Sequence, residues 1–146
     1  MIYKQTLKKE FSREENALEA NDERMAETLE RLALILDAQG KQTSAAPLRE
    51  KALKIRSESG KTSLATIMNL NELALDSQQK QDYHNAKTLY QRALSGLKEL
   101  GQDKGVEQAL ILGNFGSLEE TMKDKKAAQA LYHQSLALHE RNLSQP

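Results

Sequence analysis

The sequence predicts an all-α fold in which antiparallel helix pairs follow one another as repeats. Two observations predict it. The strong helix formers Leu, Ala, Glu, Lys, Gln and Arg dominate the composition, and one residue pattern recurs at a nearly constant spacing. The 146 residues include one Val and five Ile, so the β-branched aliphatic residues that favour sheets are scarce.

The recurring pattern reads Ala-x-x-Leu-x-x-x-small-Leu. It begins at Ala45, Ala86 and Ala128, which gives offsets of 41 and 42 residues. A second series keeps these offsets and consists of Leu29, Leu70 and Leu112. Two patterns that recur together three times predict three copies of one structural unit.

Within each copy, residues three, four and seven apart share one helical face. Small residues on that face let two helix backbones approach closely, and they are Ala33, Ala74, Gly116, Ala52, Ala93 and Ser135. Polar turns separate the two helices of a pair. Gly40 is expected just beyond the end of a first helix, and Asp82 and Asp124 are expected to cap second helices. Gly60 and Gly101 are expected to end second helices.

The elements are expected in the following order. Residues 1–22 contain a helix at about 3–20, which is expected to be the second helix of an incomplete leading repeat. Residues 23–146 contain three pairs, at about 23–60, 64–101 and 106–142. The helices of these pairs are predicted at 23–38 and 42–58, at 64–79 and 83–100, and at 106–121 and 125–142.

Three segments carry a family resemblance: Leu70-Asn71-Glu72-Leu73-Ala74, Gln39-Gly40-Lys41 and Leu89-Tyr90-Gln91-Arg92-Ala93-Leu94. Over residues 23–142 the chain resembles tetratricopeptide repeats, and within them the repeats of about 42 residues found in kinesin light chains. The resemblance implies a right-handed superhelical solenoid of antiparallel pairs, whose first helices line a concave groove. Leu36, Ser77 and Glu119 stand where the family has an aromatic residue, and Arg49 stands where Tyr90 and Tyr132 follow the family.

The resemblance also implies where a ligand lies, namely on first-helix residues turned away from the Leu/Ala core. These candidate groove residues are Glu27, Glu30, Arg31, Leu34, Asp37, Met68, Asn71, Glu72, Leu75, Gln78, Leu110, Asn114, Ser117 and Glu120. Amide side chains among them can hold a peptide backbone because each both donates and accepts hydrogen bonds. Five carboxylates against one arginine predict a preference for a peptide that bears Lys or Arg. The alternative is that these carboxylates form a solvated helix face, paired with nearby cations.

Composition argues against several other functions. Basic and acidic residues balance at 21 each, which argues against nucleic-acid binding. There is no Cys, and no apolar run reaches the roughly 18 residues of a membrane span. His84, His133 and His139 lack metal-ligand spacing. We therefore expect no enzyme, no cofactor, no metal and no membrane insertion, and a cytoplasmic location, with the periplasm also compatible.

The expected function is a scaffold that binds a protein or peptide in the groove. Two alternatives remain: a regulatory module that senses a ligand or peptide, and a scaffold that self-assembles through the ends of the stack. The last predicted helix motivates the second alternative, because it carries Leu131, Tyr132, Leu136, Leu138 and Leu143. These residues either pack inward, meet another copy, or meet further repeats of a longer chain.

Overall fold

The computed structural model describes residues 5, 9, 13, 23–60 and 62–144. The described part contains helices and no strands. Their bounds are α2 (Glu23–Ala38), α3 (Gln42–Glu58), α4 (Leu64–Gln79), α5 (Tyr83–Glu99), α6 (Val106–Thr121) and α7 (Lys125–Leu143). Each predicted helix from residue 23 onward is therefore present, with ends that differ from the prediction by at most one residue. The predicted leading helix lies largely outside the described residues.

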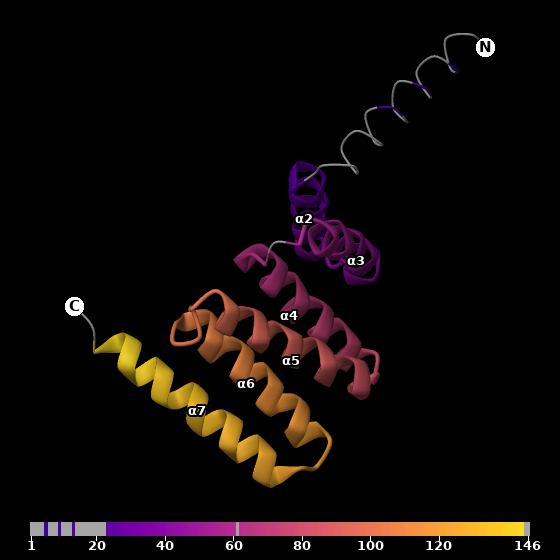
Figure 1. Ribbon diagram of the computed structural model, residues 1–146. Helices are drawn as coiled ribbons and strands as arrows, with labels where there is room; N and C mark the ends of the chain where they lie inside the picture. Colours follow the sequence, from indigo (N-terminus) through magenta and orange to yellow (C-terminus); the bar gives the residue numbers. More distant parts are fainter. Residues whose placement is uncertain (1–4, 6–8, 10–12, 14–22, 61, 145–146) are drawn as a thin grey trace. The chain divides into compact units, whose positions relative to one another are not determined.

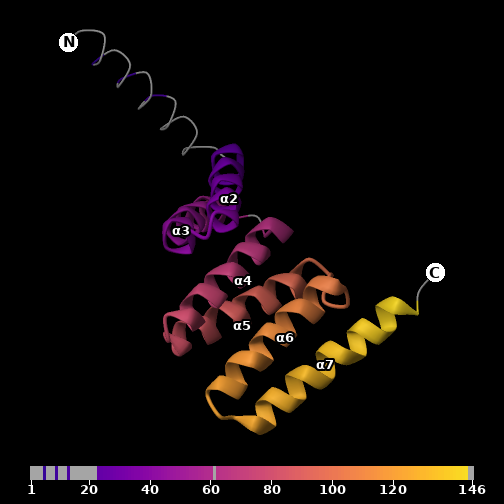
Figure 2. The same cartoon turned by 180° about the vertical axis from the view of Figure 1, so that it is seen from behind.

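The chain divides into two compact units, residues 1–61 and 62–146. In the first unit, α2 packs against α3. In the second unit, α4 packs against α5 and α6 packs against α7, while α6 also contacts α5 and α4. Figures 1 and 2 both show α4, α5, α6 and α7 following one another in chain order, so α6 lies between α5 and α7.

Turns of three residues join the helices of each pair, and one turn position has the same backbone conformation in all three. Gly40 has φ +74°, as predicted for a residue just beyond a helix end. Gln81 and Lys123 lie at the equivalent positions and have φ 65°. The left-handed region is uncommon for residues with a side chain, so the turn geometry is imposed even where the sequence does not supply glycine.

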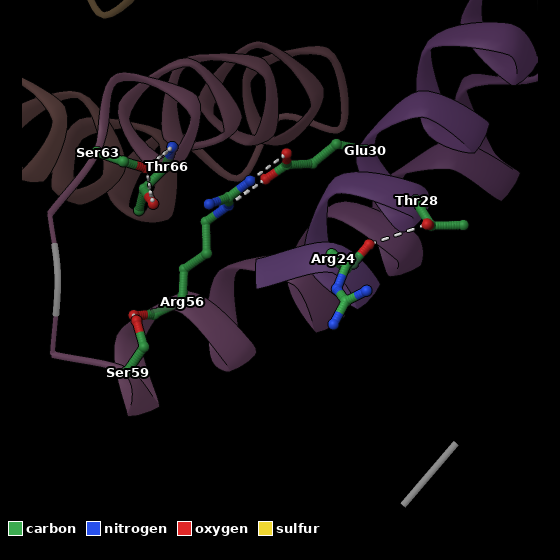
Figure 3. Close-up of polar contacts among 7 residues, drawn as sticks. All are labelled: Arg24, Thr28, Glu30, Arg56, Ser59, Ser63 and Thr66. Atoms are coloured by element: carbon green, nitrogen blue, oxygen red, sulfur yellow. Dashed lines mark hydrogen bonds and ion pairs between the residues drawn. The ribbon is translucent and has the colours of Figure 1, made fainter. Parts of the chain in front are cut away.

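Side chains cap the starts of α4, α5 and α7 in the second unit, whereas α6 begins after Gly105 without a side-chain cap. The Asp82 carboxylate accepts from the Asn85 backbone N–H at 3.3 Å, and the Asp124 carboxylate accepts from Ala127 at 3.0 Å, which confirms both predicted caps. Ser63 caps α4 in the same way by accepting from Thr66 at 3.2 Å (Figure 3). These bonds satisfy amide groups that have no partner inside the helix.

The small residues of the repeat pattern are all buried, as predicted. In the first unit, Ala26, Ala52 and Ile55 form a cluster against which Met25 and Leu29 pack. In the second unit the buried side chains are larger and include Ile67, Tyr90, Leu97, Ile111 and Leu118. The Tyr90 and Phe115 rings stack at 5.6 Å between centroids and so join α5 to α6.

Candidate protein-binding face

The candidate groove residues of the second unit come from two helices in direct contact, α4 and α6. We call their outward side the α4–α6 face, and it consists of Met68, Glu72, Leu75, Gln78, Leu110, Asn114, Ser117 and Glu120. Each of these side chains is at least partly exposed. The face exists because the small Ala74 and Gly116 turn toward the second helices, which leaves the opposite side of each first helix free.

Asn71 and Asn114 link the two helices at the centre of this face. The Asn114 amide nitrogen donates to the Asn71 amide oxygen at 3.0 Å. Asn71 is only 1% exposed, whereas Asn114 is half-buried. Asn71 is thus placed to orient Asn114, and Asn114 retains an amide oxygen and a second amide hydrogen with which it can hold a peptide backbone.

The last candidate residue of each first helix contacts the second helix of the same pair, twelve residues further along the chain. Gln78 accepts from the Tyr90 hydroxyl at 3.3 Å, and Glu120 accepts from the Tyr132 hydroxyl at 2.7 Å. In the first unit the equivalent contact is an ion pair between Asp37 and Arg49. Arg49, which stands where the family has tyrosine, therefore connects the two helices of its pair as Tyr90 and Tyr132 do. Its acceptor is the carboxylate of Asp37.

Burial and hydrogen bonding change the acidity of these tyrosines. The pKa of Tyr90 is raised above its usual value of 10, first because the hydroxyl is buried and then because Glu72 is negatively charged. The pKa of Tyr132 is raised mainly by its hydrogen bond to Glu120. Both hydroxyls therefore stay protonated at neutral pH and act as donors.

The candidate carboxylates of the first unit are all paired with arginines. Glu30 accepts two hydrogen bonds from Arg56, at 2.6 and 2.8 Å, in a fork geometry (Figure 3). Glu27 pairs with Arg31 at 2.6 Å on the exposed surface. With Asp37 paired to Arg49, the acidic character expected for this part of the groove is balanced by cations. Leu34 lies on the same helix and is exposed.

The carboxylates of the α4–α6 face have a different environment. No ion pair joins Glu72 or Glu120 to a cation among residues 62–144. Leu110, on the same helix as Glu120, is exposed, and Met68 and Leu75 of α4 are half-buried. This face therefore combines apolar surface, an amide pair and two negative charges.

Two positions that depart from the family pattern are buried polar residues with partners. Ser77 accepts from the Asn85 amide at 2.8 Å. Glu119 forms an ion pair with Lys87 at 2.9 Å, and its side chain is almost fully buried. The sequence analysis did not identify either pair. The Lys87–Glu119 pair could have been suspected from the repeat spacing, because that spacing places Lys87 on α5 and Glu119 on the next helix, α6.

The other chemical candidates remain at the surface. His84, His133 and His139 are exposed. The described part of the chain contains no group of three or more His, Cys, Asp or Glu arranged to hold a metal ion. None of the described helices is long and apolar enough to cross a membrane.

Comparison with known proteins places these features in a family. The profile of the family described as Tetratricopeptide repeat matches residues 63–141. The crystal structure of BtubC (BKLC) from P. vanneervenii, a kinesin-light-chain-like repeat protein, is similar with a TM-score of 0.75 and 27% sequence identity. The match covers 80% of this chain and 46% of BtubC, so the chain spans less than half of that structure. No curated protein sequence matches the chain.

Tetratricopeptide repeats are scaffolds generally involved in protein–protein interaction, and they are typically not catalytic. The family match covers more than half of the chain and includes both helix pairs of the second unit. The repeat spacing, the helix pairs and the family match agree, and the chain belongs to the tetratricopeptide repeat family.

Proposed function

We propose that the α4–α6 face binds a protein or peptide segment that carries Lys or Arg next to an apolar side chain. The observation that supports this most is the contrast in pairing of the carboxylates. Those of α2 are paired with arginines, whereas Glu72 and Glu120 face outward without a cationic partner in the second unit. A cation on a ligand meets an available charge on this face.

The ligand is held by three kinds of contact. Leu110, Leu75 and Met68 take an apolar side chain, and the flexible Met68 adapts to its shape. Asn114 holds a backbone amide, with Asn71 fixing its orientation. Glu72 and Glu120 attract the cation. In this proposal, the carboxylates of α2 stabilise the first unit and do not contact the ligand.

A peptide array with systematically varied charge tests this proposal. The array displays peptides of equal length in which Lys or Arg, Asp or Glu, and apolar residues are permuted. We expect the wild-type chain to bind best to peptides with a cation two to four residues from an apolar side chain. Exposed charge pairs contribute roughly 0.2–1 kcal/mol each, so Glu72→Gln with Glu120→Gln should weaken binding about two- to thirtyfold at low salt.

Charge-matched controls separate the face from general electrostatics. Glu140→Gln removes an exposed carboxylate from α7 and should leave binding unchanged. Glu27→Gln, on α2, should also have no effect. Tighter binding to acidic peptides, or equal losses in all of these variants, would contradict the proposal.

A further inference from the structure

The α7 helix carries a stripe of exposed residues, one of which, Tyr132, also touches α6. The stripe consists of Gln129, Tyr132, Leu136, His139 and Leu143, which share one helical face. Leu136 is 56% exposed and Leu143 is 85% exposed. In Figure 1, α7 is the last helix of the second unit and lies beside α6.

The equivalent stripe on α5 is covered by a first helix. With the 42-residue offset, the α5 residues are Lys87, Tyr90, Leu94, Leu97 and Gly101. Tyr90 and Leu97 are both 0% exposed. Tyr90 stacks on Phe115 of α6, and Lys87 pairs with Glu119 of α6. Within this chain, then, this face of a second helix is the surface that receives the first helix of the next pair.

The first helix α2 offers the matching surface. The α6 residues Phe115, Leu118 and Glu119 correspond to Leu32, Ile35 and Leu36 of α2. Phe115 and Leu118 are buried in the second unit, whereas Leu32 is 44% exposed and Ile35 is 55% exposed. Phe115, which stacks on Tyr90 of α5, and the buried Leu118 thus have apolar, exposed counterparts on α2.

The charges on these two surfaces are also compatible. In the contact between α5 and α6, Lys87 pairs with the buried Glu119. At the equivalent positions, α7 carries Gln129 and α2 carries Leu36. Neither is charged, so bringing the two surfaces together leaves no unpaired charge at this position, which would be costly to bury.

We propose that the stripe on α7 binds the Leu32/Ile35 surface of α2 in a second copy of the chain. The contact repeats the packing of α5 on α6 between two molecules, with Tyr132 in the place of Tyr90 and Leu32 in the place of Phe115. It joins different surfaces of the two copies and therefore continues from copy to copy unless the rotation closes a ring. This assembly is separate from ligand binding on the α4–α6 face.

Light scattering on the full chain as a function of concentration tests the proposal. The monomer mass is 16.4 kDa, and the weight-average mass of the wild-type chain should rise continuously with concentration. Leu136→Glu on α7 and Ile35→Glu on α2 should each return the mass to that of a monomer, because each introduces a charge into the contact. Leu143→Glu is a second variant of the α7 stripe and should also give the monomer mass. Leu143 is 85% exposed, so this substitution does not disturb the core.

Mixing the two variants distinguishes this contact from symmetric alternatives. Leu136→Glu retains an intact α2 surface, and Ile35→Glu retains an intact α7 stripe. An equimolar mixture should therefore form a dimer of about twice the monomer mass and nothing larger. Association of Ile35→Glu with itself would show a symmetric α7 contact and overturn the proposal, as would association of Leu136→Glu with itself.

Matched controls address folding and non-specific effects of charge. Leu34→Glu on α2 and Ala137→Glu on α7 place the same charge on the same helices at exposed positions outside the two surfaces, and both should associate like the wild type. Circular dichroism should show equal helix content in all variants. A wild-type mass of 16.4 kDa at every concentration also overturns the proposal.

Discussion

The two units connect the helices of a pair through different side chains. In α2 and α3 of the first unit the buried apolar residues are mostly alanines, and two arginines, Arg49 and Arg56, are buried with carboxylate partners on α2. In the second unit the equivalent of Arg49 is tyrosine in both pairs, and among the residues that the structure describes every large side chain that is fully buried belongs to this unit. The same helix-pair backbone therefore accepts an ionic or an aromatic connection between its helices.

This difference shows that the apolar side chains a helix can bury depend on how many helices pack against it. The α6 helix is covered on two sides, by α5 and α7, and it can bury Ile111, Phe115 and Leu118. Repeat stability is the sum of each repeat and its contacts with neighbours, so the contact between α5 and α6 adds buried apolar surface to both pairs of the second unit. The arginine pairs of the first unit connect α2 and α3 where large apolar side chains are few.

The largest expected effect comes from breaking an ionic connection in the first unit. Arg56→Ala removes the two hydrogen bonds that Arg56 donates to the mostly buried Glu30. Removing one partner of a buried pair costs about 3 kcal/mol. We expect hydrogen exchange to accelerate in α2 and α3, while α4 to α7 keep their protection.

The matched control for this variant is Arg31→Ala. Arg31 pairs with Glu27 on the exposed surface of α2, where such a pair contributes less than about 0.5 kcal/mol. Similar exchange rates in the two variants, or faster exchange spread evenly over both units, would show that the ionic connection is not what holds the first unit together.

A smaller effect is expected from adding a methyl group under the aromatic connection of the last pair. The Cβ of Gly116→Ala would lie 2.8 Å from Cε1 of the Tyr132 ring, whereas Ala33 and Ala74 stand at the equivalent positions of the other pairs. Overpacking costs about 1–3 kcal/mol, and replacing a helical glycine returns up to about 1 kcal/mol. We expect a net loss of about 1 kcal/mol in denaturant unfolding.

Repeating the Gly116→Ala substitution in a chain without the Tyr132 ring tests whether the ring causes the loss of stability. In Tyr132→Ala the ring is absent, so Gly116→Ala should stabilise the chain by up to about 1 kcal/mol through helix propensity alone. The change of sign between the two backgrounds measures the contact with the ring. The same sign in both would remove the steric explanation.

The smallest expected effect is a loss of stability at alkaline pH. It distinguishes the helix contacts made by Tyr90 and Tyr132 from the contact made by Arg49. Because burial raises the folded-state pKa of Tyr90 above 10, the unfolded chain loses this proton first, and stability falls as pH rises above 10. At pH 10.5 the loss is below about 1 kcal/mol. Tyr90→Phe should reduce the fall in stability between pH 9 and pH 10.5 in urea unfolding.

The more exposed Tyr132 provides the comparison for this pH effect. Tyr132→Phe should change the alkaline slope less than Tyr90→Phe, since burial contributes less to the Tyr132 shift. An unchanged slope in Tyr90→Phe would show that other groups control stability at alkaline pH.

Much of the fold could be predicted because it depends on local chemistry. The fixed spacing of Leu and Ala gave the helices to within one residue of their ends, and Asp82 and Asp124 were identifiable as caps from their position before a periodic segment. The small residues at the helix contacts were equally readable, since a close approach excludes larger side chains. Such features depend on residues within about one helical turn, which the sequence states directly.

The tertiary structure alone decided which polar groups meet. The sequence showed five acidic candidates and one arginine on the first helices, but Arg49 and Arg56 pair with two of these carboxylates from the second helix, twelve and 26 residues away. It likewise placed Asn71 among the candidate ligand contacts, although the packed helices leave it 1% exposed. Pairing and exposure depend on the distance between side chains from different helices, and that distance is set when the helices pack.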